Sequence, residues 1–282
     1  MNAPAKLNLC LYLGPTREDG LHELCSIFAP LLLADRIAVS TNEDEGAVDE
    51  VLCKGIDGDN LAATALRALR AEGFDAPPLR VEIDKRIPVA AGLGGGSADA
   101  AAILRLGEGR VRDLPAIARR IGADVTSQLE PRLALVEGAG ERLTPLPPAG
   151  DWGVVLIPDE RGLSTPEVYA EADRLGLGRT AEELASVRER LLAAALEGVS
   201  PLDYAELLTN DLGPAAISLR PSIGEAIDAL VEAGAEHALV TGSGPTAFGL
   251  FGDFAKADAG AAALPPRYAN AIVTGPIPAA RG

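Results

Sequence analysis

Long apolar runs are missing from this 282-residue sequence. A membrane-spanning helix needs about 20 consecutive apolar residues, and no run approaches that length. The first residues, MNAPAKLN, also lack the basic region and the apolar stretch that make up a secretory signal. The sequence therefore predicts a cytoplasmic protein that does not bind a membrane.

Cysteine and histidine are scarce. The three cysteines, Cys10, Cys25 and Cys53, form neither an even-numbered framework nor a C-x-x-C pair, and only His22 and His237 could complement them. This pattern disfavours structural disulfides and a zinc site, so we assign no metal ligand. Buried thiols are the commoner case in a reducing cytosol, although a Cys–His nucleophile stays open.

Positive charge is also in deficit, because the formal net charge is −16. Such a balance argues against a nucleic-acid surface and against an anionic membrane as partner. An anionic small substrate must then be bound by local groups. Of the 25 basic residues only four are lysines, and two of these, Lys6 and Lys85, lie in segments singled out below. A lysine in such a chain indicates a place where a compact ammonium is required.

The apolar pattern changes repeatedly between period two and helical spacing, which predicts an α+β fold with two lobes. A proline-rich segment, Pro145 to Asp151, interrupts both periods and divides the chain into predicted domains 1–148 and 149–282. Strands are predicted in segments 6–14, 35–40, 49–55, 79–87, 132–146, 152–158 and 237–251. Helices are predicted in segments 60–73, 97–104, 113–125, 180–198 and 222–235.

The segment PVAAGLGGGSADAAAIL, from Pro88 to Leu104, places four glycines between a predicted strand and a predicted helix. Such a loop lets backbone N–H groups approach an anion at a helix N-terminus, so it is a candidate phosphate site. We expect Ser97 and Asp99 to serve as cap and dipole partners of the helix. The P-loop spacing is absent, because no lysine follows the glycines, and the dinucleotide spacing fails at Ser97 and Asp99. A different phosphate loop or a plain turn remains.

This loop resembles the phosphate loop of the galactokinase, homoserine kinase, mevalonate kinase and phosphomevalonate kinase superfamily. With the segments APAKLNL, REDGLHEL, IDKRIP, GADV and TGSG, in the same order along the chain, the sequence resembles the 4-diphosphocytidyl-2-C-methyl-D-erythritol kinase family. The resemblance implies a two-lobed small-molecule kinase with its active site in the cleft between the lobes. It also implies transfer of the γ-phosphate of ATP to the 2-hydroxyl of a cytidine diphosphate sugar-alcohol, in non-mevalonate isoprenoid precursor biosynthesis.

The resemblance also implies roles for particular residues. Asp124 would accept the hydroxyl proton, and Lys6 would orient the hydroxyl and offset the developing charge. The ATP site would comprise Lys85 and Asn60, near the adenine, and the loop residues Pro88, Val89, Ala90, Ala91, Gly92, Leu93, Gly94, Gly95, Gly96, Ser97 and Ala98. Substrate would be bound by Asn8, Leu21, His22, Thr165 and Tyr169. Mg²⁺ should arrive with ATP, since it uses few protein ligands.

Simpler interpretations stay open for several of these residues. Asp124 suits a helix cap and Asn60 suits another, Lys6 suits an exposed strand end, and Tyr169 suits a core position. The family usually has tyrosine at the position of Leu21, and the segment ADVTSQLEPRLA departs from the family pattern after Asp124. Alternatives are a homoserine or mevalonate type of kinase and a non-catalytic nucleotide-binding protein. The expected partners are small molecules only, with a monomer or a weak homodimer.

Overall fold

The computed structural model describes residues 1–55, 60–159 and 161–278. These residues form two compact units that are interleaved along the chain. The first unit comprises Met1–Ala5, Leu33–Pro88 and Gly94–Pro131, and the second comprises Lys6–Leu32, Val89–Leu93 and Arg132–Gly282. Two long strands, β1 (Asn2–Thr16) and β2 (His22–Thr41), contribute residues to both units. The predicted division at residues 148 and 149 follows chain order and stays a prediction.

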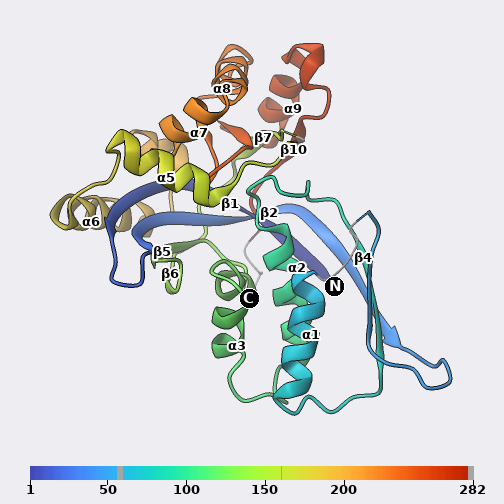
Figure 1. The fold of residues 1–282 in the computed structure, drawn as a ribbon. Coiled ribbons are helices and arrows are strands. Elements are labelled where there is room, and N and C mark those ends of the chain that lie inside the picture. Colours follow the sequence, from blue (N-terminus) through green and yellow to red (C-terminus); the bar gives the residue numbers. More distant parts are fainter. Residues whose placement is uncertain (56–59, 160, 279–282) are drawn as a thin grey trace. The chain divides into compact units, whose positions relative to one another are not determined.

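The first unit packs helices against strands (Figure 1). Strand β4 (Leu79–Asp84) pairs antiparallel with residues 36–41 of β2 and parallel with β3 (Glu50–Cys53). Alternate residues of β4, including Val81, are buried together with apolar side chains from the helices. The helices are α1 (Leu61–Ala71), α2 (Gly95–Leu104), α3 (Leu114–Ile121) and α4 (Val125–Leu129), with a 3₁₀ turn η1 (Arg105–Gly107) after α2.

The start of α2 differs from the prediction. Gly94 is the N-cap, with a left-handed φ of 69°, and the helix begins at Gly95. Ser97 therefore lies inside the first turn and does not cap the helix. Asp99 lies in the second turn, beyond the first-turn position predicted for it. Its carboxylate accepts a hydrogen bond from the Lys85 ammonium. Glycine occupies the N-cap position because the chain enters α2 through a left-handed backbone conformation, which favours glycine.

The second unit contains a hairpin and a separate four-stranded sheet (Figure 1). In the hairpin, β5 (Ala134–Gly138) pairs with β6 (Arg142–Pro145) and with residues 24–28 of β2. The sheet has the antiparallel order β10 (Ile272–Thr274), β7 (Gly153–Ile157), β9 (Ala247–Phe251) and β8 (His237–Val240). The helical elements are α5 (Thr165–Leu175), α6 (Ala181–Leu196), η2 (Pro201–Leu207), α7 (Gly213–Leu219), α8 (Ser222–Glu232), α9 (Phe254–Ala263) and η3 (Pro266–Tyr268).

The α+β class is confirmed, as are most of the predicted elements. The first half of β2 and the helices α5, α7 and α9 were not predicted, and they complete the second unit. Within residues 1–55, 60–159 and 161–278, every helix is too short or too polar to cross a bilayer.

Candidate phosphate loop and catalytic cluster

The glycine loop adopts backbone conformations that most residues avoid. Ala90, Gly92 and Gly94 all have positive φ angles, of 56°, 76° and 69°. A Cβ atom built on Gly92 would lie 2.5 Å from the carbonyl oxygen of Gly244, so only glycine fits there. Within the second unit, the hydroxyl of Thr246 donates to the carbonyl of Ala91 at 2.7 Å. These features define the loop's backbone conformation, and its role as a phosphate site stays a prediction.

The loop leads into the N-terminus of α2. The first intrahelical bond in this region joins the N–H of Ala98 to the carbonyl of Gly94 at 2.9 Å. The preceding amides, from Gly95 to Ser97, have no intrahelical acceptor, as in any α-helix. A Cβ on Gly96 would meet only the Leu61 side chain, at 3.6 Å. These amides and the positive end of the helix dipole form the kind of site that binds a phosphate.

Lys6 and Asn8 form a buried pair on β1. The Lys6 ammonium donates to Asn8 Oδ1 at 2.6 Å and lies 4.7 Å from the centre of the Phe28 ring. The amide group of Asn8 donates to Ser26 Oγ at 3.0 Å. Lys6 is only 7% exposed, so its interpretation as an exposed charge at a strand end is wrong. A charge this deeply buried needs hydrogen-bonding partners, which fix its position.

A turn between β8 and β9 adjoins this pair, and sequence reasoning gave it no role. The hydroxyl of Thr241 accepts the backbone N–H of Asn8 at 2.9 Å. Gly242 has a φ of 56°, and a Cβ there would lie 3.1 Å from Asn8 Oδ1 and 3.6 Å from Lys6 Nζ. Asn210 supports the turn through bonds from its amide group to the carbonyls of Val240 and Gly242, at 2.7 and 2.8 Å. The two glycines of the TGSG segment were the sequence feature from which this close-packed turn could have been predicted.

Two of the predicted substrate residues lie together in the second unit. The rings of His22 and Tyr169 have centroids 5.5 Å apart and are tilted by 39°. His22 is positioned by the carbonyl of Gly14, 3.2 Å from Nδ1, and by Asp173, whose Oδ1 lies 3.2 Å from Nε2. Tyr169 is partly buried and also packs against a buried apolar cluster, so its roles as a base-stacking residue and as a core residue both stay predictions. Leu21, beside His22 in sequence, is 54% exposed.

Thr165 joins another part of the predicted substrate set to the TGSG turn. It is the first residue of α5, and its hydroxyl lies 2.8 Å from the hydroxyl of Ser243. Within the second unit, Lys6 and Asn8 thus lie next to Gly242 of this turn. Thr165 lies next to Ser243 of the same turn.

Asp124 and Asn60 both lie at helix starts in the first unit, but they differ. The side chain of Asn60 accepts the N–H of Ala63 at 2.9 Å and caps α1, as its simpler interpretation predicts. In the part of the chain that the structure describes, the carboxylate of Asp124 makes no capping bond to α4. Asp124 receives a hydrogen bond on its backbone carbonyl, from Ser127 Oγ at 2.8 Å. Asp124 thus occupies the N-cap position of α4 but does not cap the helix through its side chain, and its catalytic role stays a prediction.

Lys85 is bound to two carboxylates in the first unit. Its ammonium contacts Asp35 Oδ2 and lies 2.8 Å from Asp99 Oδ2. Burial lowers the pKa of Lys85, but the hydrogen bonds to the two carboxylates outweigh it, so the pKa is raised overall. Burial raises the pKa of Asp99 to about 6. The ammonium of Lys85 is thus already engaged within the protein.

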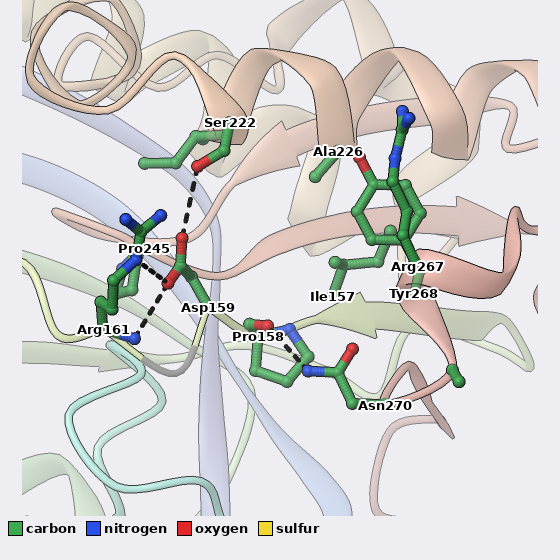
Figure 2. Close-up of a pocket in the computed structure, with 12 residues that line it drawn as sticks. Ile157, Pro158, Asp159, Arg161, Ser222, Ala226, Pro245, Arg267, Tyr268 and Asn270 are labelled. Carbon is green, nitrogen blue, oxygen red and sulfur yellow. Dashed lines mark hydrogen bonds and ion pairs between the residues drawn. The ribbon is translucent and has the colours of Figure 1, made fainter.

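A separate pocket of about 550 Å³ opens in the second unit beside the start of α8 (Figure 2). Asp159 accepts the hydroxyl of Ser222 at 3.3 Å and the N–H of Arg161 at 2.9 Å, and Asn270 donates to the carbonyl of Pro158 at 3.2 Å. None of the described residues that line the pocket was predicted to bind ATP or substrate. Its polar groups bond mainly to one another, so we assign it no part in the site.

Comparison with known proteins supports one family. Residues 60–126 match the family model described as GHMP kinases N terminal domain, and residues 178–270 match GHMP kinases C terminal. The 4-diphosphocytidyl-2-C-methyl-D-erythritol kinase of Streptomyces avermitilis is 41% identical, over 94% of this chain and 91% of that protein. The protein of the same name from Saccharopolyspora erythraea is 41% identical, over 100% of this chain and 92% of its own length.

Solved structures agree with this relationship. A crystal structure of 4-(cytidine 5'-diphospho)-2C-methyl-D-erythritol kinase superposes with a TM-score of 0.80 at 34% identity, covering 99% of both chains. Homoserine kinase from Cytophaga hutchinsonii shares the fold, with a TM-score of 0.72 at 17% identity over 97% of this chain and 92% of that one. The chain belongs to the GHMP kinases and, within them, to the 4-diphosphocytidyl-2-C-methyl-D-erythritol kinase family.

Proposed function

We propose that this chain transfers the γ-phosphate of ATP to the 2-hydroxyl of 4-diphosphocytidyl-2-C-methyl-D-erythritol, a step of non-mevalonate isoprenoid precursor biosynthesis. The observation that carries the proposal is the similarity to curated relatives of that name, which extends over almost the whole chain. Homoserine kinase and mevalonate kinases match at 12–20% identity, which supports a common fold and not a common acceptor.

The phosphates of ATP would bind at the glycine loop. The positive-φ backbone from Ala90 to Gly94 and the amides at the start of α2 are suited to cradle them. Asn60 and Lys85 lie in the same unit as α2 and are proposed for the adenine side. Because the Lys85 ammonium is bound to Asp35 and Asp99, its contribution to the base would come from its backbone or its methylene groups.

For the chemical step, the acceptor hydroxyl oxygen forms a bond to the γ-phosphorus while the bond to the β,γ-bridging oxygen breaks. Asp124 would take the hydroxyl proton, and ADP would leave. Lys6 would orient the hydroxyl and offset negative charge on the transferred group. Phosphoryl transfer asks a protein mainly for positioning and for electrostatic stabilisation, which a buried ammonium fixed by Asn8 can supply.

Mg²⁺ would accompany ATP and neutralise charge on its phosphates. This ion prefers octahedral oxygen coordination, keeps several waters and takes one or two carboxylates together with phosphate oxygens. The proposal therefore needs no dedicated cluster of acidic side chains. Mg²⁺ binding should accordingly depend on ATP.

The cytidyl end of the acceptor would bind in the second unit. His22 and Tyr169 are adjacent aromatic groups there, and Leu21 would cover the other face of the base. Asn8 and Thr165, both bonded to the TGSG turn, would contact the polar parts of the acceptor. A monomer or weak homodimer and a cytoplasmic location remain predictions.

An acceptor panel tests the proposal. The purified full chain is incubated with ATP, Mg²⁺ and one of three acceptors: the cytidyl substrate, homoserine or mevalonate. We expect only the cytidyl substrate to be phosphorylated. ³¹P NMR would detect the released ADP and the new phosphate monoester. Turnover of homoserine or mevalonate instead would assign the chain to a sister activity, and ATP binding without turnover of any acceptor would support a non-catalytic role.

A further inference from the structure

A buried cluster of three charges lies directly beneath the start of α2. Asp35 is fully buried, and the side chains of Asp99 and Lys85 are only 7% and 12% exposed. These residues come from three segments: β2, the exit of β4 and the second turn of α2. The ammonium contacts both carboxylates, at 2.8 Å in the case of Asp99.

This cluster is an unusual way to stabilise a core. Bringing three charged groups out of water is costly, and apolar residues of similar size often stabilise a fold equally well. Moreover, Asp99 Oδ1 is buried without a hydrogen-bond partner among the described residues. Stability alone is therefore weak ground for the cluster, and its position next to the phosphate loop points to a positioning role.

The contacts of the cluster are directed at the phosphate loop. Asp35 Oδ1 accepts the backbone N–H groups of Arg86 and Ile87, at 2.6 and 2.8 Å, and so fixes the chain just before the loop. On the other side of the loop, a Cβ on Gly95 would lie 3.1 Å from both Lys85 Nζ and Ile87 Cγ2. Asp99 then holds the same ammonium from within α2.

We propose that Asp35, Lys85 and Asp99 act as positioning residues, which hold the start of α2 where its amides meet the phosphates of ATP. This inference rests on the proposed function only for the use of ATP. It assigns the Lys85 ammonium to support of the phosphate site and not to recognition of adenine. Because phosphates are common to all nucleoside triphosphates, loss of the ammonium should weaken each of them equally.

Lys85→Met tests this inference, since it keeps most of the aliphatic stem and removes the charge. We expect the KM values for ATP and for GTP to rise by the same factor, roughly ten-fold for loss of a coupled network, with the KM for the acceptor unchanged. The matched control is Lys54→Met at an exposed lysine of the same unit, which should alter neither value. A rise in the KM for ATP without a rise in the KM for GTP would overturn the proposal in favour of an adenine contact. Unchanged KM values for both triphosphates would also overturn it.

Asp99→Asn provides a second variant if Lys85→Met fails to fold, because it is nearly isosteric. The same equal rise for ATP and GTP is expected, and a selective or absent effect again overturns the proposal. A double variant, Lys85→Met with Asp99→Asn, should be no worse in ATP KM than Lys85→Met alone, since both remove one network. Failure of the cytidyl acceptor assignment would leave these triphosphate measurements intact, because triphosphate binding can be followed by calorimetry without an acceptor.

Discussion

The α-carbon of Gly92 faces the carbonyl oxygen of Gly244 so closely that a Cβ on Gly92 would lie 2.5 Å from it. The oxygen belongs to the backbone, so it cannot move aside as a flexible side chain can. Gly92 also has a φ of 76°, which strains any residue with a side chain. Within the second unit, the phosphate loop at Gly92 therefore packs closely against the backbone of the TGSG turn at Gly244.

Gly92→Ala should consequently damage both stability and ATP binding. We expect the free energy of unfolding to fall by about 1–3 kcal/mol, the usual cost of a strained backbone position. ATP affinity should fall too, measured by titration calorimetry on the folded fraction. Gly224→Ala, in α8 of the same unit and outside the site, is the control, because a Cβ there meets only Ile217 at 3.5 Å. Equal stability of Gly92→Ala and the wild type would contradict the close approach.

Asp124→Asn should preserve the fold and abolish most turnover. Asparagine has nearly the same size and shape as aspartate, so the substitution should change the free energy of unfolding little. A positioned general base is worth roughly 10²–10⁴ in rate, and kcat should fall by that factor with ATP affinity retained. Asp75→Asn, at an exposed position of the same unit, is the control. A kcat near the wild-type value would remove Asp124 from the mechanism.

Local sequence patterns predicted some elements well. Helix α1 was predicted because Asn60 is a strong cap and Leu66 and Leu69 recur at helical spacing. The first half of β2 was missed because its residues are buried almost without interruption, so the run CSIFAPLLLA shows no alternation. Helix α7 was missed for a different reason, since it is short and begins with Gly-Pro.

Some residues of the candidate site could likewise be predicted from the sequence, and others could not. The glycine loop and the position of Lys6 were accessible from short motifs, which record local backbone requirements. Asp35 lies 50 residues before Lys85, and Asn210 reaches the TGSG turn from the segment between η2 and α7, so neither contact follows from a short motif. The start of α2 at Gly95 was missed because Ser97 is a good cap by type, whereas the loop geometry favours Gly94.

Lys6→Arg should be nearly as damaging as Lys6→Ala. The ammonium is 2.6 Å from Asn8 Oδ1, and even a Cβ on Gly242 would lie only 3.6 Å from Nζ, so a planar guanidinium has no room. We expect kcat to fall by roughly 10²–10³ in both variants, as for loss of one preorganised donor. Steady-state assays at saturating ATP measure the effect, with the exposed Lys256→Arg as control. An active Lys6→Arg enzyme would show that charge alone suffices.

Tyr169→Ala should raise the KM for the cytidyl substrate. Base–aromatic stacking is worth about 1–3 kcal/mol, and Tyr169 presents its ring beside His22. Leu21→Tyr should lower the same KM several-fold by supplying a second aromatic face, with ATP affinity unchanged. Tyr268→Ala, which removes a tyrosine from the separate pocket, is the control. If Tyr169→Ala leaves the KM unchanged, Tyr169 is a core residue only and the cytidyl site lies elsewhere.

Asp99 should make stability depend on pH in an unusual direction. Burial raises its pKa from 3.8 to about 6, so between these values the folded state binds more protons than the unfolded state. The stability that Asp99 contributes is then present in acid and is lost as the pH rises through about 6. The titratable groups that act on Asp99 are Lys85 and Asp35, with the thiol of Cys53 also sensing the cluster.

Asp99→Asn isolates this effect, because asparagine stays neutral at every pH. The difference in unfolding free energy, variant minus wild type, should become more favourable to the variant by about 1–3 kcal/mol between about pH 4.5 and about pH 7.5. Contributions from groups outside the Asp35–Lys85–Asp99 cluster cancel in the difference, so the difference reports the titration of the cluster. Denaturant unfolding of both proteins at the two pH values measures it. A difference that is constant with pH would mean that Asp99 titrates normally, and one that moves in favour of the wild type would mean that Lys85 holds Asp99 ionised.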